Sequence, residues 1–509
     1  MPAHLEFDLR FSRPVAPRRR PEGNPMRLLL LGNFSGRAAW VADDAAAEPH
    51  WALHRVDIDN LDEVVRRIAP QVPFPASAGA PAAVLDIESL DDFHPDRLVE
   101  RLDLCARLID LRGRLRDPAR FEQAADELRS TGLARTPLGE APPDPGISGD
   151  AENDGATLQR LLGRASGPAP AAAPPGAVGI DALIRSIVAP HIAPDRSTLQ
   201  EPYIAAVDAA IGDQIRQQLH APAFTALEMA WRGVQWLVSR LELNDDLQLY
   251  LLDASRDTLQ ADFAAAHGDL SRSALGRLLG GRGSDTPDGP HWSLLVGLFD
   301  IHPTVEDLDL LGWLGALAAQ AGGPFVAGAA PALFGCQSLS GLVDPQQWQP
   351  LAGDVAQRWS DLRRCAVAPW VGLVAPRLLL RLPYGKATDP TERFAFEEQG
   401  AVPLHETLAW GPGSLAVALL IGQAFSDSGW DLALGQAQDL ADLPAYTFSR
   451  DGESQLQPCA EAWLGERAGQ AFLERGLMPL LSHRQRAAVR LMRMQSIAEP
   501  ACPLAGSWG

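Results

Sequence analysis

Histidines, cysteines and adjacent acidic residues are the side chains of this sequence that could perform catalysis or hold a metal. His291, His302 and His405 are isolated and far apart along the chain. The five cysteines are scattered, and no two of them have the spacing of a zinc or redox motif. We therefore predict core or turn positions for the histidines, buried or free thiols for the cysteines, and no metal site.

The sequence patterns of common hydrolases and nucleotide-binding proteins are absent. There is no His-Glu-x-x-His, Cys-x-x-Cys or Gly-x-Ser-x-Gly, and the glycine-rich turn at 32–36 lacks the lysine of a phosphate loop. Ser414 follows Gly-Pro-Gly but has no histidine base near it in sequence. The acidic pairs Asp91-Asp92 and Glu397-Glu398 are typical of solvated faces. We predict no catalytic residue, no cofactor and no enzyme activity; a hydrolase whose site is assembled from distant loops is the remote alternative.

The composition is that of a large globular protein. With 509 residues, 46% of them hydrophobic and 21% charged, the chain can form more than one domain with its own core. A formal charge of −20 argues against nucleic-acid binding, which needs a basic surface. The apolar runs are far shorter than the roughly 20 residues that span a bilayer, so we expect no membrane insertion. The scattered cysteines favour the reducing cytoplasm.

The N-terminal part begins with two strand patterns. Residues 4–11 alternate perfectly, which predicts a half-buried strand with Leu5, Phe7, Leu9 and Phe11 on one face. The alternation alone leaves open whether this strand folds back on its own sheet or pairs with a sheet edge of another molecule. Residues 26–34 form a continuous apolar run, which predicts a fully buried strand.

Two helices are predicted before residue 133. Asn60, with Glu63 three residues on, is a candidate N-cap for a helix whose apolar side holds Leu61, Val64, Val65 and Ile68. A strand at 83–87 precedes a long helix from about Pro95 to Leu115. Its apolar stripe comprises Leu98, Leu102, Cys105, Leu108, Ile109 and Leu115. The arginines on its other side fit either a solvated face or a packing site for an acidic neighbour.

The chain divides by composition into four segments. Residues 1–133 form a first domain, the Pro/Ala/Gly-rich stretch 134–179 a linker, residues 180–498 a second domain, and 499–509 a tail. In the second domain, helical patterns alternate with apolar strands at 247–253, 293–300 and 324–328 and in the run 370–385, which Pro376 divides. We predict an α/β fold with mixed, largely parallel sheets covered by helices.

The stretch 220–238 is the most informative helix pattern. Phe224, Leu227, Trp231 and Val234 recur at three- and four-residue steps, which predicts a buried amphipathic helix. Glu228 and Arg232 lie four residues apart, and such a pair, if exposed, is worth only about 0.3–0.5 kcal/mol. We therefore expect Trp231 to anchor this helix and Glu228 to be replaceable by alanine at little cost.

The residue motifs in these stretches are more specific than their hydrophobic periodicity. The pattern H-x-P-x-F-x-x-L-E-x-x-W-R-G at 220–233 resembles the large sheath subunit of type VI secretion systems. The phrase DDFHPDRL at 91–98 and the turn GNFSG at 32–36 resemble the small sheath subunit of the same machine. Later stretches of the second domain continue the likeness in order: LLVGLFD, LGALAAQAGGPFVAGAAPALFG, PRLLLRLPYG, FAFEE, LAWGPGSLAVA, FSDSGWD and LERGLMPLL.

The resemblance implies a small subunit fused to a large one, with the two halves packed together as in a sheath heterodimer. The implied function is that of a structural component of a contractile sheath, which assembles by strand exchange and drives an inner tube outward. The implied partners are other copies or other sheath subunits, the inner tube protein and the baseplate. The residues to which it assigns roles are Leu5, Phe7, Leu9 and Phe11 for the inter-protomer strand; Phe93, Leu98, Leu102, Cys105 and Ile109 for packing between the halves; and Phe224, Leu227, Trp231, Arg232 and Val234 for the core helix of the large half.

The sequence departs from the family in two places. The large subunit of the family continues beyond the region that matches Gln495-Ser496, so we expect a C-terminal segment to be missing or supplied by another chain. The recycling unfoldase engages the N-terminal end of the large subunit, and here the linker occupies that end, which argues against recycling. An adaptor or cap at a sheath end or baseplate, unable to polymerise, is the alternative function.

Overall fold

The computed structural model describes residues 24–37, 51–74, 83–132, 188, 200–280, 291–339, 344–434, 438–484 and 486–508. The predicted strand at 4–11 and the linker at 134–179 lie outside these ranges. In the described part, no helix combines the length and the apolar character needed to cross a membrane.

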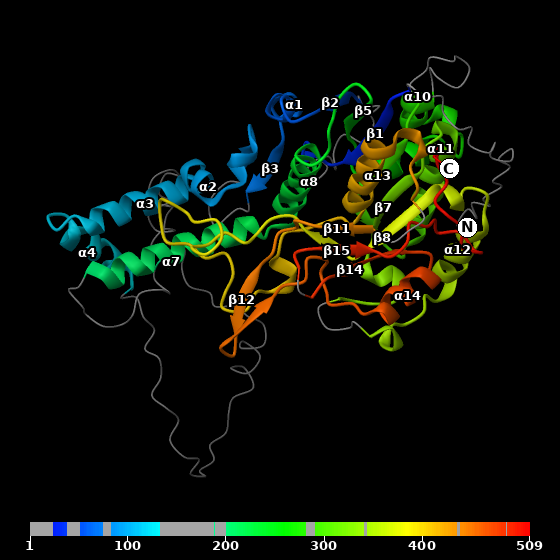
Figure 1. Cartoon of the computed structure of the whole chain (residues 1–509). Coiled ribbons are helices and arrows are strands. Elements are labelled where there is room, and N and C mark those ends of the chain that lie inside the picture. Colours follow the sequence, from blue (N-terminus) through cyan, green and yellow to red (C-terminus); the bar gives the residue numbers. More distant parts are fainter. Residues whose placement is uncertain are drawn as a thin grey trace, which may run out of the picture. The chain divides into compact units, whose positions relative to one another are not determined.

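A nine-stranded sheet is the largest sheet of the described residues (Figure 1). Its order is β11-β15-β14-β8-β7-β6-β1-β5-β2. The six strands from β14 to β5 are mutually parallel, whereas β2, β15 and β11 pair antiparallel at the two sides. This architecture confirms the predicted mixed, largely parallel sheet. The strands are β1 Met26–Gly32, β2 Leu53–Val56, β5 Leu247–Asp253, β6 Leu294–Ile301, β7 Phe325–Ala329, β8 Val371–Ala375, β11 Gln438–Leu440, β14 Met478–Ser482 and β15 Val489–Leu491.

Strand β1 is seated in the middle of strands that lie more than 200 residues later in the chain. Leu30 is paired with Leu251 of β5 on one side and with Val296 of β6 on the other. Successive side chains of a strand point to opposite faces, and helices cover both faces of a parallel sheet. All four leucines of β1 are therefore fully buried, which explains why its sequence is a continuous apolar run.

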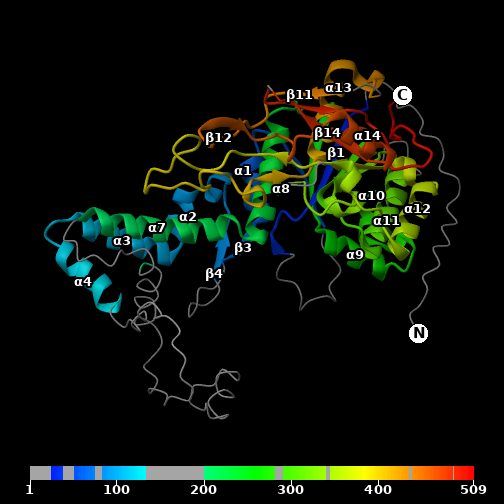
Figure 2. The same ribbon diagram turned by 90° about the horizontal axis from the view of Figure 1, so that it is seen from below.

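Helices cover both faces of the sheet (Figure 2). Leu29 and Leu31 of β1 share one apolar cluster with Leu311 and Leu314 of α11 and with residues of α9, α10 and α12. The Thr304 hydroxyl accepts a hydrogen bond from the Asp307 amide and so caps the N-terminus of α11. The other face is covered by α13, against which α8 packs. The helices are α8 Pro222–Val238, α9 Arg256–Ala265, α10 Ala274–Gly280, α11 Val305–Ala321, α12 Gly353–Arg364, α13 Ser414–Ser428 and α14 Glu466–Glu474.

Helices α8 and α13 approach each other at glycines. A Cβ atom on Gly233 would lie 2.8 Å from the Leu415 side chain, and one on Gly422 would lie 2.6 Å from Leu241. Atoms this close would overlap, so a larger residue at either position would push the helices apart. The glycine of the Trp-Arg-Gly sequence in α8 is thus explained by helix packing.

The described residues fall into two compact units. Unit 1 contains the nine-stranded sheet and comprises residues 1–75, 83–98 and 215–509; unit 2 comprises 76–82 and 99–214. In unit 2, α3 (Asp103–Arg116) and α4 (Phe121–Gly132) contact α7 (Gln200–Leu219). Arg112 pairs with Asp208 at 2.5 Å, and the rings of Phe121 and Tyr203 are 5.8 Å apart. The predicted boundaries at 133 and 179 stay predictions.

Two local predictions were wrong. The helix predicted from Pro95 to Leu115 is two helices, α2 (Pro95–Arg101) and α3, because Leu102 has an extended backbone conformation. Asn60 makes no side-chain cap on α1 (Leu61–Ile68); its amide oxygen instead accepts a hydrogen bond from the Asp57 amide. The predicted apolar side of α1 is confirmed, since its four apolar residues are buried.

Short antiparallel pairs complete the described strands. Strand β4 (Ala83–Asp86) pairs with β3 (Gln71–Phe74), and β12 (Thr447–Arg450) forms a hairpin with β13 (Glu453–Leu456). The run 370–385 is divided around Pro376 into β8 and β9 (Leu378–Leu379), as predicted, and β9 pairs with β10 (Trp410–Gly411).

Candidate functional site

The glycine-rich turn after β1 is held by its neighbours in the sheet. The amides of Phe34 and Ser35 both donate to Oδ1 of Asp253, at 2.8 and 2.9 Å. Gly36 has a φ of 71°, and a Cβ atom there would lie 2.0 Å from the Gln71 carbonyl oxygen. Only glycine satisfies both the conformation and the space. The turn therefore has one fixed shape, and it exposes no backbone nest for a phosphate.

Trp231 of α8 packs on this turn. Its indole Nε1 donates to the Phe34 carbonyl at 3.0 Å, and the two rings meet edge to face with centroids 5.4 Å apart. Both side chains are fully buried. The hydrogen bond and the ring contact fix the angle of α8 relative to β1.

The segment around residues 88–96 contacts the same region of unit 1. Asp92 accepts hydrogen bonds from the Glu88 and Ser89 amides and so closes the 3₁₀ turn Leu90–Phe93. The Phe93 ring then meets Phe224 of α8 edge to face at 5.5 Å. Helix α8 thus contacts both stretches of the N-terminal part in which characteristic sequence phrases occur.

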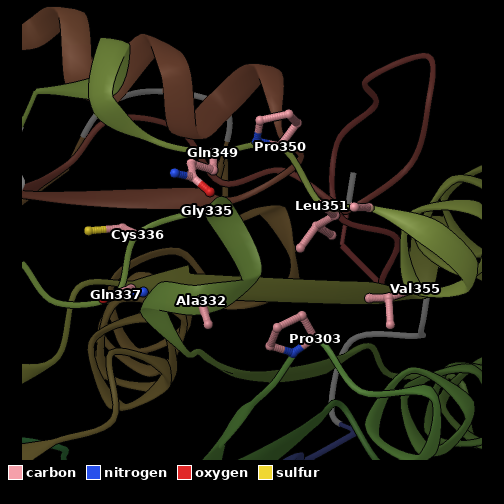
Figure 3. Close-up of a pocket in the computed structure, with 10 residues that line it drawn as sticks. Pro303, Ala332, Gly335, Cys336, Gln337, Gln349, Pro350, Leu351 and Val355 are labelled. Atoms are coloured by element: carbon pink, nitrogen blue, oxygen red, sulfur yellow. The ribbon is translucent and has the colours of Figure 1, made fainter.

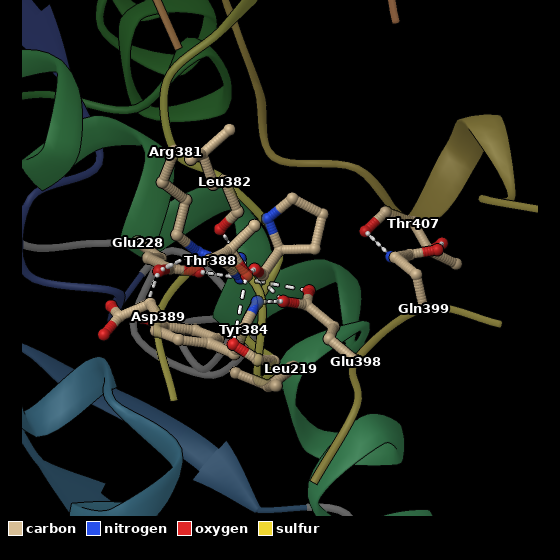
Figure 4. Close-up of polar contacts among 12 residues, drawn as sticks. Leu219, Glu228, Arg381, Leu382, Tyr384, Thr388, Asp389, Glu398, Gln399 and Thr407 are labelled. Carbon is tan, nitrogen blue, oxygen red and sulfur yellow. Dashed lines mark hydrogen bonds and ion pairs between the residues drawn. The ribbon is translucent and has the colours of Figure 1, made fainter. Parts of the chain in front are cut away.

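Buried charges surround the other side of α8, in a group that we call the Arg381 cluster (Figure 4). The Arg381 guanidinium donates two hydrogen bonds to Glu228, at 2.7 and 3.1 Å. It donates two more to Glu398, at 2.7 and 3.2 Å. The side chains of Glu228 and Glu398 are both 1% exposed, and the guanidinium lies 4.2 Å from the Tyr384 ring centroid. One planar cation therefore joins two helix- and loop-borne carboxylates in the interior.

The opposite charges of Arg381 and Glu398 counteract the effect of burial on their pKa values. Burial acts to lower the pKa of Arg381, but Glu228 and Glu398 raise it well above its usual range. Burial acts to raise the pKa of Glu398, but Arg381 and a hydrogen bond from His220 lower it. Burial also raises the pKa of the Tyr384 phenol, which keeps the hydroxyl protonated. The four hydrogen bonds of the Arg381 guanidinium to Glu228 and Glu398 make the cluster a structural connection between α8 and the loop segments.

A second buried pair, the Arg377 cluster, lies in the segment after β8. The Arg377 guanidinium donates two hydrogen bonds to Oε1 of Glu461, and its backbone amide donates to Oε2. His405 Nε2 lies 3.1 Å from Oε1. Burial acts to raise the pKa of Glu461, but the hydrogen bond from His405 and the Arg377 charge lower it to about 2. His405 therefore has a structural partner, in agreement with its predicted core or turn position.

The cavities of the described part offer little for chemistry. One of about 310 Å³ is lined mainly by apolar and amide residues, and Cys336 is its only thiol (Figure 3). Burial raises the pKa of this thiol, which donates to the Ser338 carbonyl. A second cavity of about 450 Å³ contains His302 and Asp307, but Asp307 is occupied by Arg256, Gln260 and the His302 amide at the start of α11. Among the residues described, no group of His, Cys, Asp or Glu could hold a metal ion.

Comparison with known proteins identifies both halves of the chain. Residues 201–498 match the VipB/EvpB tail sheath N-terminal domain, which is more than half of the chain. The chain belongs to the type VI secretion tail sheath family. Residues 21–131 match the VipA family of type VI secretion systems, so this sheath-family chain joins a VipA-like and a VipB-like part.

A curated relative gives the same result for the VipB-like part. The chain is 29% identical over 307 residues to the type VI secretion system sheath protein TssC1 of Pseudomonas aeruginosa. The alignment covers 59% of this chain and 62% of that protein. The sheath-family chain thus spans less than two thirds of the length of this relative.

The predicted site residues lie in different parts of the chain and differ in burial. Leu5, Phe7, Leu9 and Phe11 lie outside the described residues. Phe93 and Leu98 are buried in unit 1, where Phe93 contacts Phe224; Leu102 and Cys105 are buried in unit 2, and Ile109 there is half-buried. In α8, Phe224, Leu227, Trp231 and Val234 are buried and Arg232 is half-buried. The role of these residues in packing between the halves stays a prediction.

The expectation that Glu228 is dispensable was wrong. Its spacing to Arg232 is that of an exposed pair, and Arg232 does approach it at 3.6 Å, but Arg381 is its main partner. Asp253, Arg377, Arg381 and Glu461 are further residues of the interior that sequence reasoning missed. The available signal was an arginine inside an apolar run, since PRLLLRLPYG places Arg377 and Arg381 four residues apart between buried leucines.

Proposed function

We propose that this chain is a structural subunit of a type VI contractile sheath in which one polypeptide supplies both the small-subunit and the large-subunit part. The observation that carries the proposal is the seat of β1 between β5 and β6, with its turn packed on Trp231. A VipA-like strand inside a VipB-like sheet makes the two parts one folding unit. The ratio of the parts is therefore fixed at one to one.

The proposed mechanism is mechanical and not catalytic. Copies of the chain assemble in the cytoplasm around an inner tube, in contact with a baseplate, and the sheath shortens to drive the tube outward. The buried and fully paired Arg381 cluster supports this function, because a subunit that transmits force needs an interior that stays rigid while its contacts change. The half-buried strand predicted at 4–11 is proposed to link neighbouring subunits by joining their sheets.

Electron microscopy of the purified full-length protein tests the proposal. The expected result is long tubes with regularly ridged walls in negative stain. Discrete particles that never extend, at any protein concentration, would contradict the sheath function and favour a cap or adaptor.

Deletion of residues 1–13 tests the predicted linking strand. Its apolar face of Leu5, Phe7, Leu9 and Phe11 is worth on the order of 1.5–3 kcal/mol per fully buried side chain, and we expect that burial to occur only between subunits. The deleted chain should keep its melting temperature and form no tubes. A large loss of thermal stability in the unassembled subunit would show instead that the strand belongs to its own sheet.

A further inference from the structure

The two sides of the nine-stranded sheet carry opposite charge. Residues 483–493, the turn between β14 and β15 with β15 and its end, contain four arginines and no carboxylate. All four are exposed, and we call them the basic edge: Arg484, Arg486, Arg490 and Arg493.

Strand pairing places the basic edge at one end of the sheet order. Arg490 of β15 stands directly opposite Asp439 of β11, the last strand on that side. Arg490 donates to Asp439 at 2.7 Å, and Arg486 reaches the same carboxylate at 3.3 Å. Hydrogen bonds from Arg490 and His483 lower the pKa of Asp439 well below its usual range. Asp439 faces two of the four arginines and Glu466 also acts on Arg490, so the arginines of the edge outnumber these two carboxylates.

Carboxylates gather at the opposite end of the sheet order. They follow β2 and precede its partner β5, and we call them the acidic edge: Asp57, Asp59, Asp62, Glu63, Asp245 and Asp246. Arg55 of β2 donates to the Asn244 carbonyl at 2.8 Å, which holds the two loops together. The Asp245 side chain is 98% exposed, although it lies 3.4 Å from Arg55. The arginines of the segment, Arg55, Arg66 and Arg67, are fewer than the carboxylates.

We propose that the basic edge of one copy of this chain docks on the acidic edge of the next. The occupant is a second copy because the two surfaces are complementary in charge and lie on different sides of one sheet. Such a head-to-tail contact joins unlike surfaces, so it propagates into a ring or an open helix and does not stop at a dimer. The inference rests on the proposed sheath function and names one of its subunit contacts.

The salt dependence of self-association distinguishes this contact from the effect of the overall negative charge of the protein. Copies of an acidic chain repel each other, and added salt weakens that repulsion. Attraction between the two edges is weakened by the same salt. Self-association that falls between about 50 mM and about 500 mM NaCl is therefore the sign of the edge contact, since screening at the higher concentration shortens the reach of the charges to a few ångströms.

The test uses charge reversal in the full chain, measured by sedimentation velocity and electron microscopy. Arg484→Glu with Arg493→Glu reverses the basic edge; Asp59→Arg with Asp245→Arg reverses the acidic edge. Each double variant should self-associate at least about tenfold more weakly than the unchanged protein, because like charges then face each other. The four-fold variant that carries all these changes should regain association, and so should an equal mixture of the two double variants.

A matched control removes the effect of net charge. Arg364→Glu with Arg450→Glu changes exposed arginines outside both edges by the same total charge as the basic-edge variant and should associate like the unchanged protein. Melting temperatures verify that every variant is folded; if a double variant unfolds, Asp245→Arg and Arg493→Glu alone and mixed give the same comparison.

The outcomes distinguish the two proposals. Tubes that form equally well with either edge reversed would overturn the edge contact and leave the sheath function standing. Failure of the four-fold variant to associate while it stays folded would also overturn the contact. A wild-type chain that remains monomeric at every salt concentration would overturn both.

Discussion

The Arg381 cluster and the charges around Asp439 are made from the same chemical groups and differ in exposure. Arg381 binds Glu228 and Glu398, whose side chains are 1% exposed. Arg490 binds Asp439 with equally short hydrogen bonds, but these side chains are 50% and 34% exposed. Hydrogen-bond length therefore says little about the importance of an ion pair for folding.

The difference lies in what remains when one partner is removed. A charge left alone in the interior has lost its water and gains nothing in return, which costs about 3–5 kcal/mol. A charge left alone at the surface is hydrated again, so exposed pairs are worth about 0–1 kcal/mol. The buried cluster thus contributes to the stability of the fold, whereas the exposed arginines are available to a partner.

Replacement of Arg381 should give the largest effect. Arg381→Ala leaves two carboxylates buried side by side, and we expect a loss of about 5 kcal/mol of unfolding free energy or insoluble protein. Chemical denaturation of the purified variant measures the loss. Arg381→Lys is the control, because it keeps the charge but not the two-pronged geometry and should recover part of the stability. A loss below about 1 kcal/mol would show that the cluster is hydrated.

Replacement of Trp231 measures how much apolar packing contributes to the stability of this region. Trp231→Ala removes a fully buried side chain and its hydrogen bond to Phe34, and we expect a loss of about 4 kcal/mol. Denaturant midpoints give the value, and Trp231→Phe should lose less because it leaves a smaller cavity. If the alanine variant is as stable as the unchanged protein and fails only in assembly, α8 presents an interface. The distinction between a buried region around α8 and the exposed charges around Asp439 would then be wrong.

The Arg377 cluster should show a pH dependence between these extremes. The pKa of Glu461 is about 2 in the folded chain, against an ordinary value of 4.5. A depressed pKa adds stability above the unfolded value, and that stability disappears as the pH falls from about 4.5 towards 2. Glu461→Gln should be less stable than the unchanged protein by about 3 kcal/mol at neutral pH.

This difference should shrink steadily when the denaturant midpoints of the two proteins are compared down to about pH 3. A gap that is the same at pH 3 and pH 7 would mean that the Glu461 charge does not contribute.

The smallest effect is expected at the exposed charges. Asp439→Asn should change the unfolding free energy by no more than about 0.5 kcal/mol, as is usual for surface substitutions. Thermal unfolding at low and high salt measures it, with the unchanged protein alongside. A loss of several kcal/mol would place Asp439 with the buried cluster and remove the distinction between the two regions.

The sequence predicts the bounds of the strands in this fold better than it predicts which strands pair with each other. The apolar run 247–253 coincides with β5, and Pro376 divides its run as expected from the missing amide. The position of β1 between β5 and β6 could not be predicted from residue patterns, since an apolar strand carries no sign of which distant strand it will pair with. The family resemblance supplied the expectation that the two halves pack together.

Buried charge is the second thing that pattern reading missed. The four-residue spacing of Glu228 and Arg232 indicates only a local pair within α8. The partner that makes burial tolerable, Arg381, comes from a loop 153 residues away. Ion pairs between distant segments become visible only when the fold brings them together.

The seat of β1 also sets an order of events on the ribosome. Strand β1 is synthesised early, but its neighbour β6 ends only at Ile301. At about 5–20 residues per second, the intervening chain takes roughly 15–55 s to make. For most of that time β1 has no partner strand, because β5 is complete only at Asp253 and β6 later still. Once β6 emerges, the covalent link supplies β1 at a fixed local concentration. Closure of the sheet is then a first-order step, independent of how much of the protein the cell produces.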